Sequence, residues 1–271
     1  MTRRTPIAIA IAAAVGLAAP ASASALTVYS ASSLRDVFMQ IDSTPTYNFA
    51  GSNQLQTQIQ AGAPADVFAS ASPAEPQAVF KSGNCLRPVT FATNKLVMIV
   101  PKANTAKVTS VYSLRKGGLR VSIGTAGVPI GSYTRSVLKR LGLTGALGKN
   151  TVSEETNVAG IVSKIALGSA DVGFAYVTDA KIASTQVRAI RLPTYAQPPV
   201  RYGICVVKRP GADTKGATAF IAKVRSTRGR SLLKKAGFGL PPAVTKPKPK
   251  PKHTPKAMPK GMVMSKSKSK A

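Results

Sequence analysis

The chain has 271 residues, and its 38 lysines and arginines outnumber nine aspartates and glutamates, giving a net charge of +29. That length suits about two compact lobes, and such a positive charge attracts anions of every kind, nucleic acid and acidic membranes included. The single histidine, His253, lies near the C-terminal end of the sequence. Its absence elsewhere argues against serine–histidine or cysteine–histidine hydrolysis and against histidine-built zinc sites. We therefore expect no catalytic residue, no metal-cation ligand and no cofactor.

Residues 1–25 are predicted to form a signal peptide. Arg3 and Arg4 precede an apolar run from Ile7 to Ala19, and a group of small residues ends at Ala25. This order of charge, apolar core and cleavage site is typical of secretion, and the run is too short for a membrane-spanning helix. The protein is expected to be exported, to the periplasm or the cell envelope.

The opposite end, residues 241–271, changes to Lys-Pro and then Ser-Lys repeats. This composition predicts a disordered, self-repelling tail. It either contacts an anionic cell envelope or serves only as a solubilising tail. Without Arg3, Arg4 and the nine lysines beyond residue 240, 27 basic residues still face nine acidic ones, so the globular part keeps about +18.

Between these ends, strand-like runs alternate with helical periodicities in two series. The first series comprises a strand at 26–30, a helix face at Leu34, Val37, Phe38 and Ile41, an extended run at 45–50, a helix through Leu55 and Ile59, a strand at 66–69, a helix at 73–81 and a strand at 94–100. The second comprises a strand at 119–124, helix faces at Tyr133, Val137, Leu138 and Leu141 and at Val158, Ile161, Val162 and Ile165, strands at 171–176 and 202–208, and helices through 220–224 and 231–236.

This alternation predicts an α/β fold with two similar lobes and mainly parallel sheets, joined by a two-strand hinge. We expect lobe I to take residues 26–93 with 206–240, and lobe II to take 94–205. The two crossovers of the hinge are predicted near Thr93–Lys95 and near Arg201–Tyr202. A ligand would lie in the cleft between the lobes.

Polar or small residues stand where predicted strands turn into predicted helices, at Ser33, at Gly51-Ser52, at Pro129 to Tyr133 and at Thr156 to Val158. Helix N-termini present unpaired N–H groups and about half a positive charge each, so several of them together could hold an anion without lysine or arginine. A serine at such a position is most often only a helix cap. Tyr176, at the end of its strand, is by the same reasoning most often a half-buried core residue.

Seven stretches of the sequence form a recognisable series, namely TVYSASSL at 27–34, FAGS at 49–52, AGAPADVF at 61–68, NKLV at 94–97, VPIGSY at 128–133, NV at 157–158 and GFAY at 173–176. In this order they resemble the periplasmic molybdate-binding proteins of molybdate ABC transporters. The similarity covers nearly all of residues 26–240. It departs from the family in a shorter segment before Tyr47, in Asn53 where a small hydroxyl residue is common, and in the basic tail.

The resemblance implies a type II periplasmic-binding fold that captures molybdate, with tungstate, as an oxyanion for the membrane permease of an ABC importer. The family's oxyanion-binding groups fall on Ser33, Ser52, Ile130, Val158 and Tyr176. Ile130 and Val158 would act through their backbone N–H groups. Such a site suits a fully deprotonated anion, whereas a protonated phosphate would benefit from a carboxylate acceptor. Glu154 and Glu155 lie near the predicted ligand loop and leave that possibility open.

Several alternatives remain open at this stage. The ligand could be sulfate or another oxyanion, or the protein could be a basic envelope protein that binds polyanions. Nucleic-acid binding is not expected, and the protein is expected to be a monomer. Cys85 and Cys205 suit either one disulfide, as in many exported proteins, or two separate buried thiols. A disulfide between them is predicted to lie near the hinge and to limit its opening.

Overall fold

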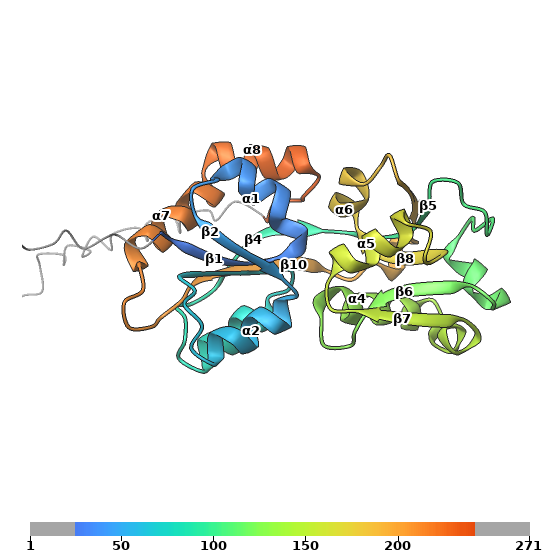
Figure 1. Cartoon of the computed structure of the whole chain (residues 1–271), viewed down its shortest axis with the longest axis horizontal. Helices are drawn as coiled ribbons and strands as arrows, with labels where there is room; N and C mark the ends of the chain where they lie inside the picture. Colours follow the sequence, from blue (N-terminus) through green and yellow to red (C-terminus); the bar gives the residue numbers. More distant parts are fainter. Residues whose placement is uncertain (1–24, 242–271) are drawn as a thin grey trace, which may run out of the picture. The chain divides into compact units, whose positions relative to one another are not determined.

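The computed structural model describes residues 25–241, apart from the side chain of Thr151. The predicted signal peptide, except Ala25, and the predicted tail beyond Pro241 lie outside the described residues. Within that range, two five-stranded sheets are each covered by helices on both faces (Figure 1). In the same range, no helix is long and apolar enough to cross a membrane.

The first sheet has the strand order β2-β1-β3-β10-β4. Its strands are β1 (Thr27–Ala31), β2 (Thr46–Ala50), β3 (Val67–Ser70), β4 (Val89–Asn94) and β10 (Val200–Val206). Strand β1 is parallel to β2 and β3, while β10 is antiparallel to β3 and β4. One face of this sheet is covered by α1 (Arg35–Ile41), α7 (Thr214–Arg225) and α8 (Thr227–Ala236), and the other by α2 (Ser52–Gln60) and α3 (Ala74–Lys81) (Figure 1).

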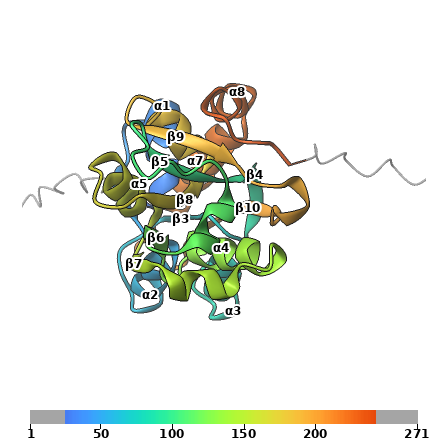
Figure 2. The same ribbon diagram turned by 90° about the vertical axis from the view of Figure 1, so that its right-hand side faces the viewer.

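The second sheet repeats this arrangement in the order β7-β6-β8-β5-β9. Its strands are β5 (Leu96–Pro101), β6 (Arg120–Gly124), β7 (Thr151–Glu155), β8 (Val172–Tyr176) and β9 (Val187–Arg191). Its helices are α4 (Pro129–Arg140) on one face (Figure 2), and α5 (Val158–Ala166) with α6 (Val177–Ile182) on the other (Figure 1). Short 3-10 helices are η1 (Ser32–Leu34), η2 (Val111–Lys116), η3 (Thr144–Lys149) and η4 (Thr194–Ala196).

The predicted fold class, α/β with two similar lobes, is confirmed, but the sheets are mixed rather than mainly parallel. In each sheet, one strand has two parallel neighbours and another has two antiparallel ones. The sheets are mixed because the chain passes from one lobe to the other and then returns. A strand that returns from the other lobe, such as β10, enters its sheet in the opposite direction to the strands already there.

The lobe boundary predicted at residue 205 is placed too late. Strand β10 pairs with lobe I from Val200, opposite Asn94, onward. The crossover predicted near Arg201–Tyr202 therefore lies earlier, between the end of β9 and the start of β10. The first crossover lies at Lys95, between β4 and β5, as predicted. We propose revised limits of 26–94 with 200–240 for lobe I and 95–199 for lobe II.

Helix α5 illustrates how local sequence builds these elements. Asn157 caps its N-terminus, because the Asn157 side chain accepts a hydrogen bond from the Gly160 N–H at 3.1 Å. Val158, Ile161 and Ile165 form the apolar stripe that is buried against the second sheet. The helix is followed by Gly168, whose φ of +70° suits glycine and ends the helical path. The cap and the stripe together place the first turn of α5 at the edge of lobe II.

Candidate functional site

The carboxyl ends of the parallel strands carry a cavity between the two lobes. Its wall combines residues from η1, α2, α4, α5 and the end of β8. All five predicted oxyanion-binding residues line it, namely Ser33, Ser52, Ile130, Val158 and Tyr176. The free space at its centre measures about 20 Å³, so the cavity is small and has room for at least one water-sized group.

The described residues that line this cavity are all uncharged. Helices α2, α4 and α5 each begin at its wall. Each helix N-terminus contributes about half a positive charge, so three of them supply about one and a half. The cavity therefore favours an anion through backbone groups and helix dipoles, although the protein surface carries many lysines and arginines.

Lobe I contributes two serine hydroxyls. Ser33 lies in η1, and its Oγ is 3.0 Å from the hydroxyl oxygen of Tyr202. Ser52 is the first residue of α2, and its Oγ accepts a hydrogen bond from the Ala71 N–H at 3.2 Å. Because the Ser52 oxygen is the acceptor in that bond, its own hydroxyl hydrogen is left to donate into the cavity.

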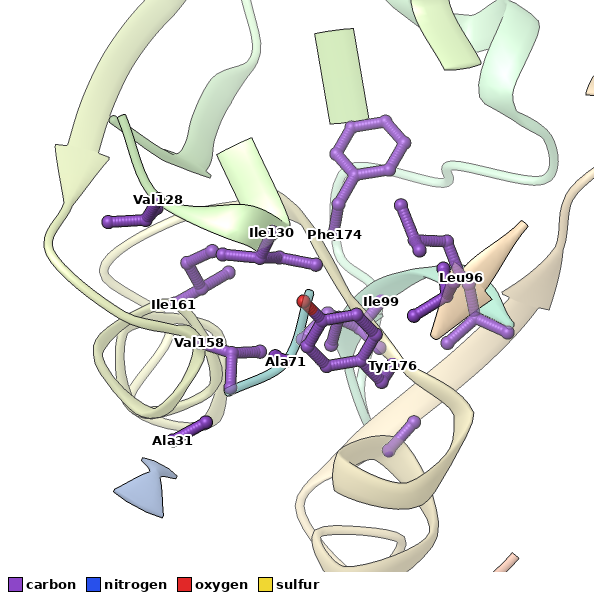
Figure 3. Close-up of a cluster of buried hydrophobic side chains, with 14 of the residues drawn as sticks. Ala31, Ala71, Leu96, Ile99, Val128, Ile130, Val158, Ile161, Phe174 and Tyr176 are labelled. Atoms are coloured by element: carbon purple, nitrogen blue, oxygen red, sulfur yellow. The ribbon is translucent and has the colours of Figure 1, made fainter. Parts of the chain in front are cut away.

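Lobe II contributes backbone N–H groups from two helix starts. Ile130 follows Pro129 at the beginning of α4, and Val158 is the first residue of α5. First-turn N–H groups have no acceptor within their own helix, so these two can donate to a ligand. The side chains of Ile130 and Val158 are buried among other apolar residues (Figure 3). This burial agrees with the prediction that Ile130 and Val158 would act through their backbone N–H groups.

Tyr176 ends β8 and supplies a third hydroxyl. The residue is 1% exposed, and its Oη has no hydrogen-bond partner within the described part of the chain. Figure 3 shows this oxygen turned toward Ile130, on the side where Val158 and Ala71 also lie. Burial, with a smaller contribution from Tyr202, raises the pKa of Tyr176 well above 10, so the hydroxyl stays protonated. A buried donor without a partner costs about 1–3 kcal/mol, which a ligand acceptor in the cavity would offset.

Sequence reasoning treated Gly51 only as part of a helix start, but the structure gives it a further role. A Cβ atom added at Gly51 would lie 2.2 Å from the carbonyl oxygen of Thr156. Gly51 belongs to lobe I and Thr156 to lobe II, so the lobes touch beside the cavity. The backbone of Gly51 has φ −66° and ψ 136°, which any residue can adopt. The glycine is therefore required by this close approach, and no local sequence signal distinguishes it from an ordinary turn glycine.

Glu154 and Glu155, the two candidate carboxylate acceptors for a protonated anion, lie outside the cavity wall. Glu154 pairs with Arg135 at 2.5 Å, and Glu155 pairs with Lys164 at 2.5 Å. Among the described residues that line the cavity, none is a carboxylate. Within residues 25–241, no cluster of three or more histidine, cysteine, aspartate or glutamate side chains could hold a metal cation.

Cys85 and Cys205 are both buried and are free thiols in the structure. A hydrogen bond with Cys85, and burial, raise the pKa of the Cys205 thiol. Cys205 pairs with Phe68 of β3, and Cys85 bridges to Val207, so both belong to lobe I. The prediction that a disulfide here would limit hinge opening is wrong, because both ends lie in the same lobe.

Comparison with known proteins gives consistent matches over the whole described region. A family model for bacterial extracellular solute-binding proteins matches residues 26–239. The molybdate-binding protein ModA of Mycobacterium tuberculosis is 37% identical over 229 residues, covering 81% of this chain and 86% of the relative. These matches confirm the resemblance to molybdate-binding proteins that the sequence indicated.

Solved structures share the fold at lower identity. The periplasmic molybdate-binding protein of Azotobacter vinelandii superposes with a TM-score of 0.71 at 23% identity, covering 80% of this chain and 99% of that one. The sulfate-binding protein SubI of M. tuberculosis gives a TM-score of 0.67 at 16% identity, covering 79% and 86%. The type II periplasmic-binding fold is thus common to relatives named for different oxyanions.

Proposed function

Because this chain belongs to the bacterial extracellular solute-binding proteins, we propose that it captures molybdate, and tungstate with it, and delivers the anion to an ABC importer. The observation that carries this proposal is the wall of the cavity between the lobes. Three hydroxyls and two helix-start N–H groups meet there, among residues that carry no charge. Molybdate and tungstate are fully deprotonated at neutral pH and offer only acceptors, so they match a wall of donors.

The donors belong to both lobes, and this division suggests how the anion is held. Ser33 and Ser52 bind from lobe I, while Ile130, Val158 and Tyr176 bind from lobe II. A ligand that contacts both sets stabilises the state in which the lobes meet, so binding and closure are coupled. The contact between Gly51 and Thr156 lies beside the cavity and completes the closed state. Opening at the two crossovers of the hinge then releases the anion to the permease.

Sulfate is the second candidate ligand. It is also a fully deprotonated tetrahedral dianion, so the same donors suit it, and the fold is shared with a relative named for sulfate binding. The choice between the two depends on how well each anion fills the closed cavity.

Thermal unfolding of the mature protein with molybdate, tungstate, sulfate and phosphate, at matched ionic strength, tests the proposal. A ligand at about 1,000 times its dissociation constant adds roughly 4 kcal/mol to the free energy of unfolding. We expect a large shift with molybdate and tungstate and little with phosphate. A large shift with sulfate alone would make this a sulfate-binding protein. Equal small shifts with every anion would mean that only the basic surface is being titrated.

We also propose that the protein acts outside the cytoplasm, as a monomer and without enzymatic activity, and that residues 1–25 direct its export. The remaining candidate, envelope polyanion binding, is favoured by the net charge of +29. Surface binding of that kind weakens steeply with salt, whereas binding inside the cavity does not. Retention on anionic vesicles at low and high salt, with and without residues 242–271, separates envelope contact by the tail from capture of the anion.

A further inference from the structure

Tyr202 is the residue behind Ser33, on the side away from the cavity. It lies in β10, is fully buried, and packs edge-on against Tyr176, with ring centroids 5.8 Å apart. Its hydroxyl oxygen lies 3.0 Å from Ser33 Oγ and 3.4 Å from Asn94 Nδ2. Burial raises the pKa of Tyr202 well above 10, so this hydroxyl carries one hydrogen at any physiological pH. The direction in which that hydrogen points decides what Ser33 can offer a ligand.

Asn94 fixes that direction. The Lys95 N–H can only donate, and it lies 2.9 Å from one side-chain atom of Asn94, which must therefore be the oxygen, Oδ1. The other end of the amide is the NH₂ group, and it faces both Thr178 Oγ1 at 3.0 Å and the Tyr202 hydroxyl. An NH₂ group can only donate, so the Tyr202 oxygen is an acceptor in this contact.

A hydroxyl oxygen that accepts from one neighbour is free to donate to the other. The Tyr202 hydrogen is therefore directed at Ser33 Oγ, which makes the Ser33 oxygen an acceptor on that side. The hydrogen of Ser33 itself is then left for the cavity. This chain of bonds runs in one direction, from Asn94 through Tyr202 to Ser33.

We infer that Tyr202 is a positioning residue that holds the Ser33 hydroxyl as a donor toward the cavity and thereby selects fully deprotonated oxyanions over protonated ones. The inference rests on the proposed function. With Ser52 held by the Ala71 N–H and Tyr176 unpaired, all three hydroxyls then present hydrogens to the ligand. A molybdate oxygen accepts each of them, whereas the P–OH group of hydrogen phosphate must find an acceptor and meets another hydrogen instead.

Two substitutions test this order of bonds. Tyr202→Phe keeps the ring but removes the hydroxyl, so the Ser33 group can turn and either donate or accept. Asn94→Asp has almost the same shape, but its carboxylate accepts from Tyr202, which reverses the chain and turns the lone pairs of Ser33 toward the cavity. The probes are molybdate and hydrogen phosphate at about pH 8, where both are dianions, so the added charge of the aspartate affects both equally.

The measured quantity is the ratio of the dissociation constants of hydrogen phosphate and molybdate, obtained by calorimetric competition. We expect Tyr202→Phe to lower this ratio about ten-fold and Asn94→Asp to lower it further, since a hydrogen bond to a charged ligand changes an affinity by about that factor. The matched control is Tyr47→Phe, which removes a hydroxyl bonded to the Asp42 carbonyl, away from the cavity. The control should leave the ratio unchanged.

A merely structural role of Tyr202 would weaken both anions alike, so an unchanged ratio in a folded Tyr202→Phe protein would overturn the inference. Folding is checked by thermal unfolding, and Asn94→Asp provides a second variant. If the wild-type protein binds sulfate but not molybdate, the proposed ligand is wrong, and the ratio is then measured against sulfate. In that case, a ratio of the phosphate and sulfate dissociation constants that is the same in the variants as in the wild type would reject the role of Tyr202 independently of the proposed ligand.

Discussion

The two lobes have the same strand arrangement but provide different kinds of donor. Lobe I presents side-chain hydroxyls from Ser33 and Ser52, each held by a further hydrogen bond. Lobe II presents one hydroxyl, that of Tyr176, and two backbone N–H groups, those of Ile130 and Val158, whose side chains are buried in the core. The difference teaches where the site is open to change by substitution. In lobe I a side chain is itself the ligand group, whereas in lobe II most of the binding is built into the helix starts.

Removing both hydroxyls of lobe I should have the largest effect. Each hydrogen bond to a charged partner contributes about 1.5–3 kcal/mol, so Ser33→Ala with Ser52→Ala should weaken molybdate binding more than about a hundred-fold. Isothermal titration calorimetry measures the loss. Ser132→Ala is the matched control, because its hydroxyl bonds to the Ala126 carbonyl and lies outside the cavity wall. Near-normal binding by the double variant would show that the lobe I assignment is wrong.

Two acidic residues, Asp36 in α1 of lobe I and Asp179 in α6 of lobe II, predict a dependence of the protein's stability on pH. Burial raises the pKa of Asp179 in lobe II to about 7, and Asp36 in lobe I adds to the increase. Because this folded-state pKa lies above the ordinary value of 3.8, the folded protein holds a proton that the unfolded chain releases. The contribution to stability is thus full below about pH 4 and is lost as the pH rises to about 7.

Asp179→Asn should remove this loss. The residue is partly exposed as a whole, but its Oδ2 is enclosed and unpaired among the described residues. We expect the variant to be more stable than the wild type at pH 8 by up to a few kcal/mol, and the difference to shrink toward pH 4. Urea unfolding at a series of pH values measures it. A difference that does not change with pH would show that Asp179 is ionised throughout the range.

The contact between the lobes gives a third test. Gly51→Ala places a methyl group 2.2 Å from the Thr156 carbonyl oxygen, so the lobes must stay apart. Gly127→Ala is the matched control in lobe II, since its methyl group would meet only Asn53 Nδ2, at 3.5 Å. Overpacking costs about 1–3 kcal/mol, so molybdate affinity should fall about ten-fold in the first variant and hardly at all in the second. Equal molybdate affinities in the two variants would show that the contact between Gly51 and Thr156 has no part in ligand capture.

The smallest effect on binding is expected from the side chains of lobe II. Ile130→Val should lower the free energy of unfolding by about 1 kcal/mol, because it removes one buried methylene group. Molybdate affinity should stay within about two-fold, because the backbone N–H is retained. Chemical unfolding and calorimetry on the same preparation measure both quantities. A loss of affinity as large as that from a single serine substitution in lobe I would contradict the division between side-chain and backbone donors.

The sequence predicted the central strands and the helices with buried stripes better than the edges of the sheets. Strands β4, β7 and β9 were not predicted. Each lies at the edge of a sheet, and the run VRAIR of β9 carries exposed arginines that hide its alternation. Charged residues are common on edge strands, where they prevent pairing with other chains. The apolar central strand β8 was placed correctly from its pattern.

For the site, the sequence indicated five residues of the cavity wall but not the groups behind them. Ser33 and Ser52 stand at helix starts, which can be recognised from a local pattern. Tyr202 and Asn94 are 108 residues apart, and the direction of their hydrogen bond depends on a third residue, Lys95. The need for glycine at position 51 likewise depends on Thr156, in the other lobe. Contacts of this kind join residues far apart in the sequence, so they arise only in the folded chain.

The most direct test of the account is the position of molybdenum in crystals of the complex, located by its anomalous scattering. We predict one strong peak in the cavity between the lobes, with anion oxygens within hydrogen-bond distance of the Ser33, Ser52 and Tyr176 hydroxyls and of the Ile130 and Val158 N–H groups. No lysine or arginine side chain should touch the anion. A peak held by surface lysines or arginines, with the cavity empty, would contradict the claim that uncharged donors capture the ligand.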